Sequence, residues 1–106
     1  MENRALPGSF DDLLAQADKP VLADFRADWC GACRSLDPVL KRIAAEYKGR
    51  ILTIRIDVDK RPAIASRYEV SGIPTVILFR SGNPVMRFSG ALPYDEFKRR
   101  LDQALV

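Results

Sequence analysis

The segment Ala23-Asp24-Phe25-Arg26-Ala27-Asp28-Trp29-Cys30-Gly31-Ala32-Cys33-Arg34 contains both cysteines of the chain. Two thiols at this spacing can close a small disulfide ring, and so can take up and release two electrons. A ring this short restricts the unfolded chain very little, so it makes a poor structural crosslink. Zinc usually needs four Cys or His ligands, and this chain has no histidine and no third cysteine. Redox chemistry is therefore favoured over a metal site or two inert buried thiols.

Length and composition restrict the class of protein. With 106 residues, 47% of them hydrophobic and 29% charged, we expect a single globular domain over residues 1–106. No apolar run approaches the roughly 18 to 20 residues that cross a bilayer. The first residues lack the apolar core of a secretory signal, so we expect a cytoplasmic protein. In that reducing compartment a cysteine pair is more often catalytic than structural.

The net charge of +3 is spread along the chain, and Lys98-Arg99-Arg100 is the one short basic run. A nucleic-acid-binding protein would carry a denser basic stripe. We therefore expect no nucleic-acid partner and no membrane partner, and we interpret the charges mainly as a solvated surface.

Hydrophobic spacing predicts an α/β domain with the sheet inside and the helices outside. The expected elements are a helix from Ser9 to about Lys19, a strand over 21–27, a helix from about Ala32 or Cys33 to Tyr47, a strand over 50–58, a short helix capped by Asp59 and ending near Tyr68, strands over 75–79 and 84–89, and a last helix from Tyr94. The strand-helix-strand unit over 21–58 predicts two parallel strands. The turn at 81–83 predicts an antiparallel hairpin. Pro38 predicts a kink in the long helix, and Pro93 suits the first turn of the last one.

The two cysteines lie at the start of the long helix. Unpaired backbone N–H groups and the helix dipole favour negative charge there, and hence the thiolate form. Cys30, just before the helix, is the expected nucleophile. Cys33, in the first turn and less exposed, is the expected resolving thiol.

Asp24 interrupts an otherwise apolar strand. Burial would raise the pKa of its carboxyl group, so that it could exchange a proton with Cys33 near neutral pH. The alternative is that Asp24 pairs with Arg26 on its own face or with Arg55 across the sheet, and stays an anion. We favour the proton-transfer role.

With these features placed, the chain resembles the thioredoxin family over almost its whole length. The matching residues are Asp24-Phe25, Ala27, Trp29-Cys30-Gly31, Cys33, Pro38, Asp57, Asp59, Tyr68, Gly72-Ile73-Pro74-Thr75, the turn over 79–82, and Gly90. The resemblance implies a thioredoxin fold, a central mixed sheet of four or five strands flanked by four helices. The fifth strand would lie around Glu2 to Ala5. It also implies a cis Ile73-Pro74 bond, where base rates alone predict trans.

The resemblance also implies how substrates dock. An extended segment of the target would pair with the backbone at Ile73 as an added strand. A flat apolar surface around the nucleophile, with Trp29 partly exposed, would receive it. Its expected residues are Trp29, Gly31, Ala32, Gly72, Ile73, Pro74, Gly90 and Ala91.

The implied activity is that of a protein dithiol-disulfide oxidoreductase, a monomeric general reductant of protein disulfides that serves electron transport and cell redox homeostasis. It binds no cofactor and uses its Cys30-Cys33 disulfide, which a thioredoxin reductase recycles with NADPH. Three residues depart from the family pattern, since Ala32 stands where proline is common, Arg26 where tryptophan is usual and Arg55 where lysine is common. The alternatives are the oxidant or isomerase direction of the same chemistry, or a binding module whose thiols are incidental.

Overall fold

The computed structural model describes residues 9–106. The elements along this part of the chain are α1 (Phe10–Gln16), β1 (Val21–Arg26), α2 (Gly31–Glu46), β2 (Leu52–Asp57), α3 (Pro62–Arg67), β3 (Thr75–Arg80), β4 (Asn83–Ser89) and α4 (Tyr94–Leu105). The predicted order and type of these elements are confirmed, although α1 ends before the predicted Lys19 and β2 is shorter than predicted. The strand expected around Glu2 to Ala5 lies outside the described residues.

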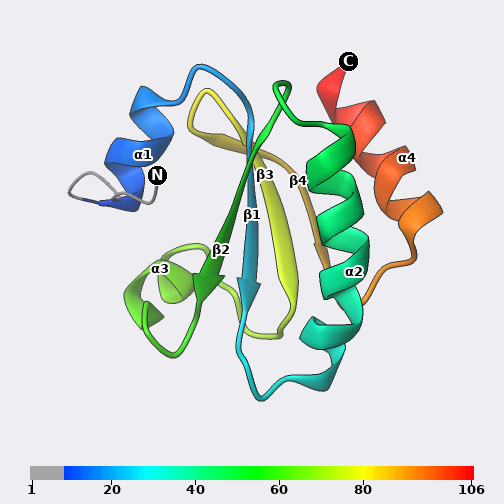
Figure 1. Ribbon diagram of the computed structural model, residues 1–106. Helices are drawn as coiled ribbons and strands as arrows, with labels where there is room; N and C mark the ends of the chain where they lie inside the picture. Colours follow the sequence, from blue (N-terminus) through cyan, green and yellow to red (C-terminus); the bar gives the residue numbers. More distant parts are fainter. Residues whose placement is uncertain (1–8) are drawn as a thin grey trace.

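The four described strands form one mixed sheet in the order β2-β1-β3-β4. β1 and β2 are parallel, as predicted for a strand-helix-strand unit, and the other two pairs are antiparallel. Ser81 and Gly82 turn the β3–β4 hairpin with φ angles of 52° and 81°, a conformation that glycine adopts easily. Figure 1 shows α1 and α3 on one side of the sheet and α2 and α4 on the other.

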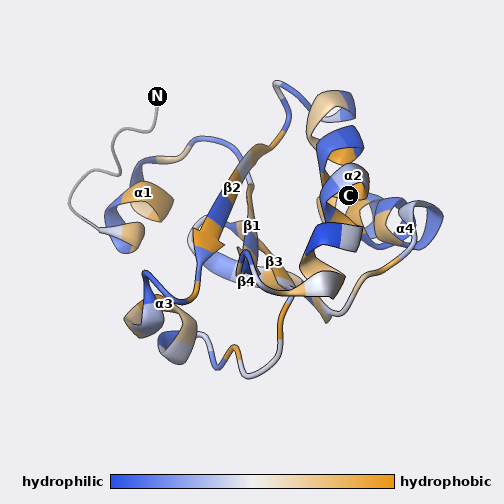
Figure 2. Cartoon of the chain, turned by 60° about the horizontal axis from the view of Figure 1, so that its bottom comes forward, coloured by the Kyte–Doolittle hydropathy of each residue, from blue (hydrophilic) through white to orange (hydrophobic). Residues whose placement is uncertain are grey.

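Two hydrophobic layers hold the helices to the sheet. On one face, Leu22 of β1 packs with Leu36, Leu40 and Ile43 of α2 and with Phe97 of α4. On the opposite face, the buried members of the layer are Phe10, Leu14, Val21, Ala23, Phe25, Ile56, Ala65, Ile77 and Phe79. Figure 2 shows hydrophilic and hydrophobic residues alternating around α2 and α4, as expected for helices with one buried side.

The alternation along β1 determines where its polar residues lie. Val21, Ala23 and Phe25 belong to the layer under α1 and α3, whereas Leu22 belongs to the layer under α2 and α4. Because side chains alternate between the two faces of a strand, Asp24 and Arg26 share the α2 face with Leu22. The sheet therefore presents a carboxyl group and a guanidinium group beneath the helix that carries the cysteines.

The prediction that Asp59 caps α3 is wrong. The cap residue is Arg61, which makes no side-chain cap hydrogen bond, and Pro62 occupies the first turn. Asp59 lies too far ahead of the helix, in a turn where Asp57 Oδ1 accepts a hydrogen bond from the Asp59 N–H at 2.9 Å. The Asp59 carboxylate instead accepts a hydrogen bond from Trp29 Nε1 at 2.8 Å.

Two prolines lie close to where the sequence predicted them. Pro38 is inside α2, which continues through it from Gly31 to Glu46. Pro93 is the cap residue of α4 and precedes its first turn, rather than lying within that turn. Its extended backbone, with ψ of 153°, does not continue into a helical conformation, so the helix begins one residue later.

Candidate active site

The two cysteines lie at the amino end of α2, at the edge where β1 ends. Cys30 is the cap residue of the helix, and its Sγ accepts a hydrogen bond from the Cys33 backbone N–H at 3.2 Å. Both thiols are free. Cys30 is 7% exposed and Cys33 is 1% exposed, so Cys30 is the thiol nearer to solvent.

Local hydrogen bonds fix the loop that leads to these cysteines. The Cys30 N–H donates to the Ala27 carbonyl at 3.2 Å, and the Arg34 N–H donates to the Cys30 carbonyl at 3.2 Å. The Arg34 guanidinium also donates to the Asp28 carbonyl at 2.8 Å. The loop therefore leaves β1 and enters α2 in one defined path, with Trp29 at its outer edge.

Cys33 needs a proton acceptor before it can act as a nucleophile. Burial is the main cause that raises the pKa of its thiol, to about 11, and the hydrogen bond with Cys30 raises it further. The negative charge of Asp24 acts in the same direction, which places that carboxyl group within electrostatic reach of the thiol. At neutral pH Cys33 therefore stays protonated unless a neighbouring group removes the proton.

Asp24 is the neighbouring group with the right properties. It is 1% exposed, and burial raises the pKa of its carboxyl group from 3.8 to about 6. The positive charges of Arg55 and Arg26 lower that pKa, and the negative charge of Asp37 raises it. Its Oδ1 atom is buried and has no hydrogen-bond partner within residues 9–106. A carboxyl group in this state can accept and release a proton near neutral pH.

The alternative role for Asp24 was a fixed ion pair with a neighbouring arginine. Among the described residues, the guanidinium of Arg26 pairs instead with Asp28 at 2.8 Å and with Asp37 at 3.4 Å. Arg55 pairs with Asp37 at 3.3 Å. This arrangement favours the proton-transfer role over the paired anion.

A second loop meets the cysteines from the start of β3. The Ile73-Pro74 peptide bond is cis, as the family resemblance implied. The Ile73 carbonyl oxygen lies 3.7 Å from Cys30 Sγ, and the Ile73 side chain packs against the two cysteines. The Thr75 hydroxyl donates to the Gly72 carbonyl at 2.6 Å, which fixes the turn before the cis bond.

The predicted docking surface is assembled from three segments. The Gly90 N–H donates to the Pro74 carbonyl at 2.8 Å, so the segment after β4 lies beside the cis-proline loop. Trp29 is 67% exposed. The other exposed members of the predicted set are Gly31, Ala32, Gly72 and Ala91, while Ile73 and Gly90 are half-buried and Pro74 is buried. Pro74 thus supports the surface from below.

Two features of the site have no counterpart in the sequence analysis. One is the hydrogen bond between Trp29 and Asp59, which braces the exposed indole. The other is the pair of contacts from Asp37 to Arg26 and Arg55 above Asp24. Both join residues on different elements, and the positions of Asp37 and Asp59 in the sequence carry no signal for them.

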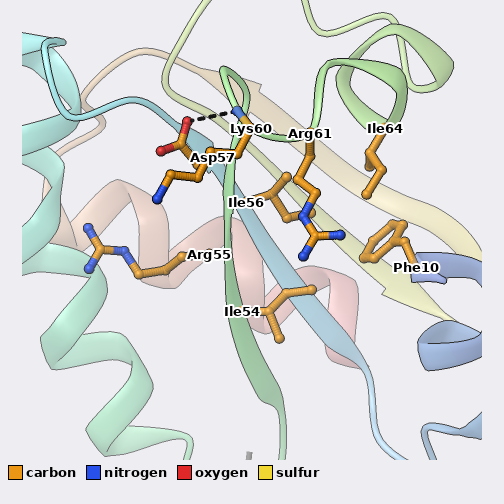
Figure 3. Close-up of a pocket in the computed structure, with 8 residues that line it drawn as sticks. All are labelled: Phe10, Ile54, Arg55, Ile56, Asp57, Lys60, Arg61 and Ile64. Carbon is orange, nitrogen blue, oxygen red and sulfur yellow. Dashed lines mark hydrogen bonds between the residues drawn. The ribbon is translucent and has the colours of Figure 1, made fainter. Parts of the chain in front are cut away.

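A hollow of about 220 Å³ lies apart from the cysteines, between β2, α1 and α3. Figure 3 shows Phe10, Ile54, Ile56 and Ile64 at its apolar side. The remaining lining residues are Arg55, Asp57, Lys60 and Arg61. None of the predicted site residues lines this hollow.

Searches for a metal site and for a membrane span gave no candidate in residues 9–106. This part of the chain contains no group of three or more Cys, Asp or Glu side chains arranged to hold a metal ion. Its helices are all too short or too polar to cross a bilayer.

Comparison with known proteins agrees with the geometry. The thioredoxin family model matches residues 4–103. The chain is 41% identical to thioredoxin Y, chloroplastic, from Oryza sativa over 92% of its length, but it covers only 58% of that protein. It covers a similar share, 56%, of thioredoxin Y1, chloroplastic, from Arabidopsis thaliana.

A bacterial relative matches over nearly its whole length. The chain is 39% identical to thioredoxin 1 of Chlorobaculum tepidum, and the match covers 92% of this chain and 96% of the relative. With the cysteine pair at the helix start, the buried acid and the cis-proline loop in place, this protein belongs to the thioredoxin family.

Proposed function

We propose that this protein is a protein dithiol-disulfide oxidoreductase that reduces disulfides in other proteins through Cys30 and Cys33. The observation that carries the proposal is the ordered pair of thiols at the start of α2, with the more buried Cys33 donating its backbone N–H to Cys30 Sγ at 3.2 Å. Family membership supports the same activity.

The reaction proceeds in two exchanges. In the first, the Cys30 thiolate attacks one sulfur of the target disulfide, the target S–S bond breaks, and one target sulfur leaves as a thiolate. In the second, Asp24 accepts the proton of Cys33, whose thiolate attacks Cys30 Sγ and breaks the mixed disulfide. The second target sulfur leaves as a thiolate. Two electrons pass to the target, and a Cys30-Cys33 disulfide remains.

The target docks as an extended segment beside the nucleophile. The backbone of Ile73 lies next to Cys30 Sγ, so a strand added there would bring its own disulfide within reach. The exposed indole of Trp29 and the small residues Gly31, Ala32 and Gly72 leave room for that segment. Disulfide-containing proteins are thus the proposed substrates.

The oxidised protein requires two electrons to return to the dithiol. An NADPH-dependent flavoprotein thioredoxin reductase is the proposed donor, and no bound prosthetic group takes part. We further propose a monomer that acts in the cytoplasm, with no nucleic-acid or membrane partner. The plant relatives named above are described as chloroplastic, so a fluorescent fusion in the source cell is the test of location.

Reduction of insulin disulfides by dithiothreitol tests the activity. The wild-type protein should accelerate it, and Cys30→Ser should remove all acceleration because the attacking sulfur is gone. Cys33→Ser is the matched control, since it keeps the attacking thiol but cannot complete a catalytic cycle. Full acceleration by the Cys30→Ser variant would contradict the proposal. So would an active double variant, which would favour the binding-module alternative.

The direction of electron flow has its own test. Ala32 and Arg26 depart from the family pattern close to the thiols, and the oxidant or isomerase direction is the alternative. Equilibration with glutathione buffers measures the reduction potential. A potential near about −270 mV, a value typical of reducing thioredoxins rather than one derived from this structure, supports the reductant. A potential of about −180 mV or higher supports the alternative.

A further inference from the structure

Asp37 joins the three elements that surround Asp24. It lies on α2, one turn after Cys33, and its carboxylate contacts two arginines from the sheet. Oδ2 lies 3.4 Å from the guanidinium of Arg26 on β1, and Oδ1 lies 3.3 Å from the guanidinium of Arg55 on β2. One carboxylate is thus shared by two cations.

Both cations lie beside Asp24. Arg26 follows Asp24 by two positions on β1 and points to the same face of the sheet. Arg55 is the register partner of Asp24 on the parallel strand β2. Figure 3 shows the Arg55 side chain leaving β2 toward α2, away from Ile54 and Ile56 on the other face. The contacts to Asp37 therefore place both guanidinium groups over the α2 face, where Asp24 is buried.

We propose that Asp37 is a positioning residue for the proton-transfer step: it holds the guanidinium groups of Arg26 and Arg55 beside Asp24 and offsets part of their positive charge. The inference rests on the proposed function, because it assigns Asp37 a role through Asp24. Arg26 is buried, and its Nε atom has no hydrogen-bond partner within the described residues. Its charge is therefore poorly solvated, and nearby carboxylates are what balance it.

The charged and titratable groups that act on Asp24 come from every polar element packed around it. Arg26 on β1 and Arg55 on β2 favour the ionised carboxylate, whereas Asp37 on α2 disfavours it. Cys33 on α2 is the remaining neighbour that exchanges charge with Asp24. On the β3 side the register partner of Asp24 is Val76, which carries no charge. Removing the charge of Asp37 leaves two cations less compensated, so Asp24 should ionise at lower pH.

Asp28 provides a matched control. It contacts Arg26 more closely than Asp37 does, at 2.8 Å, but its side chain is almost fully exposed to water. Asp37 has a side-chain exposure of 36% and reaches Arg55 as well. Water screens the charge of Asp28, so the more distant carboxylate should have the larger effect on Asp24.

The test is a ¹³C NMR titration of the Asp24 carboxyl group in the reduced full-length protein. Asp37→Asn should move its midpoint to lower pH by about 0.3 to 1 unit, the size expected for one charge acting through a partly solvated path. Asp37→Glu keeps the charge and should restore the wild-type midpoint. Asp28→Asn should leave it unchanged. Asp37→Ala is a second neutral variant that should repeat the shift if Asp37→Asn does not fold.

A role for Asp37 in stability alone gives a different result. In that case the neutral variants lower the unfolding midpoint but leave the Asp24 titration where it was, and the proposal is overturned. A shift to higher pH also overturns it. The failure of the proposed function is separate, because it appears as a wild-type protein without disulfide reductase activity. The acid limb of the rate at which Cys33 resolves a mixed disulfide should move with the NMR midpoint in each variant.

Discussion

Replacing Asp24 with asparagine should make the reduced protein more stable at neutral pH. The folded protein buries this carboxyl group with one oxygen lacking a hydrogen-bond partner among the described residues, whereas the unfolded chain exposes it to water. Ionised Asp24 is therefore more costly in the folded state than in the unfolded one. An asparagine of the same shape has no charge to bury.

The magnitude follows from the pKa of Asp24, which burial raises from 3.8 to about 6. The folded state binds the proton more tightly than the unfolded state, so stability is greatest below pH 3.8 and falls as the pH rises to about 6. A difference of about two units corresponds to about 3 kcal/mol. Above pH 6 the full penalty is present, and Asp24→Asn should remove it.

Urea unfolding of the reduced proteins, followed by circular dichroism, measures this difference. At pH 7.5 the variant should be more stable than wild type by about 3 kcal/mol with an unchanged m-value, and the gap should close as the pH approaches 4. Equal stabilities at pH 7.5, or a gap that widens at low pH, would refute the argument. The same variant should resolve mixed disulfides more slowly at neutral pH, because Cys33 loses its proton acceptor.

Three further substitutions test the packing and the docking surface. Phe97→Ala should cost about 3 to 5 kcal/mol in urea unfolding, because Phe97 is fully buried and its ring lies 4.9 Å from that of Phe88; a loss below about 1 kcal/mol would contradict the packing. Thr75→Val should lower stability by about 1 to 3 kcal/mol, because the Gly72 carbonyl loses its hydrogen-bond donor, and Thr75→Ser should recover most of it. Trp29→Ala should raise KM for insulin more than it lowers kcat, because the indole is exposed at the docking surface; an unchanged KM would remove Trp29 from that surface.

Much of the fold could be predicted because its signals are local. Apolar spacing indicated the helices, and the continuous apolar run from Val21 to Ala27 indicated a strand buried on both faces. The burial of Asp24 followed from that run, and the position of Cys30 followed from the start of a helix. These features depend on residues that are neighbours in the sequence.

What the sequence did not reveal depends on contacts between distant segments. Asp59 has the right chemistry and approximate position to cap α3, and only the path of the turn directs it to Trp29 instead. The cis Ile73-Pro74 bond goes against the base rate for prolines, and family resemblance rather than local chemistry implied it. The link from Asp37 to Arg26 and Arg55 requires the relative placement of a helix and two strands.

The central claim is that Cys30 attacks the target and Cys33 releases it. Mass spectrometry of the Cys33→Ser protein after incubation with a disulfide-containing protein tests this most directly. The account predicts a stable one-to-one adduct linked through Cys30, which dithiothreitol reverses and which the wild-type protein does not accumulate. An adduct on Cys33 in a Cys30→Ser protein, with none on Cys30 in the Cys33→Ser protein, would contradict it.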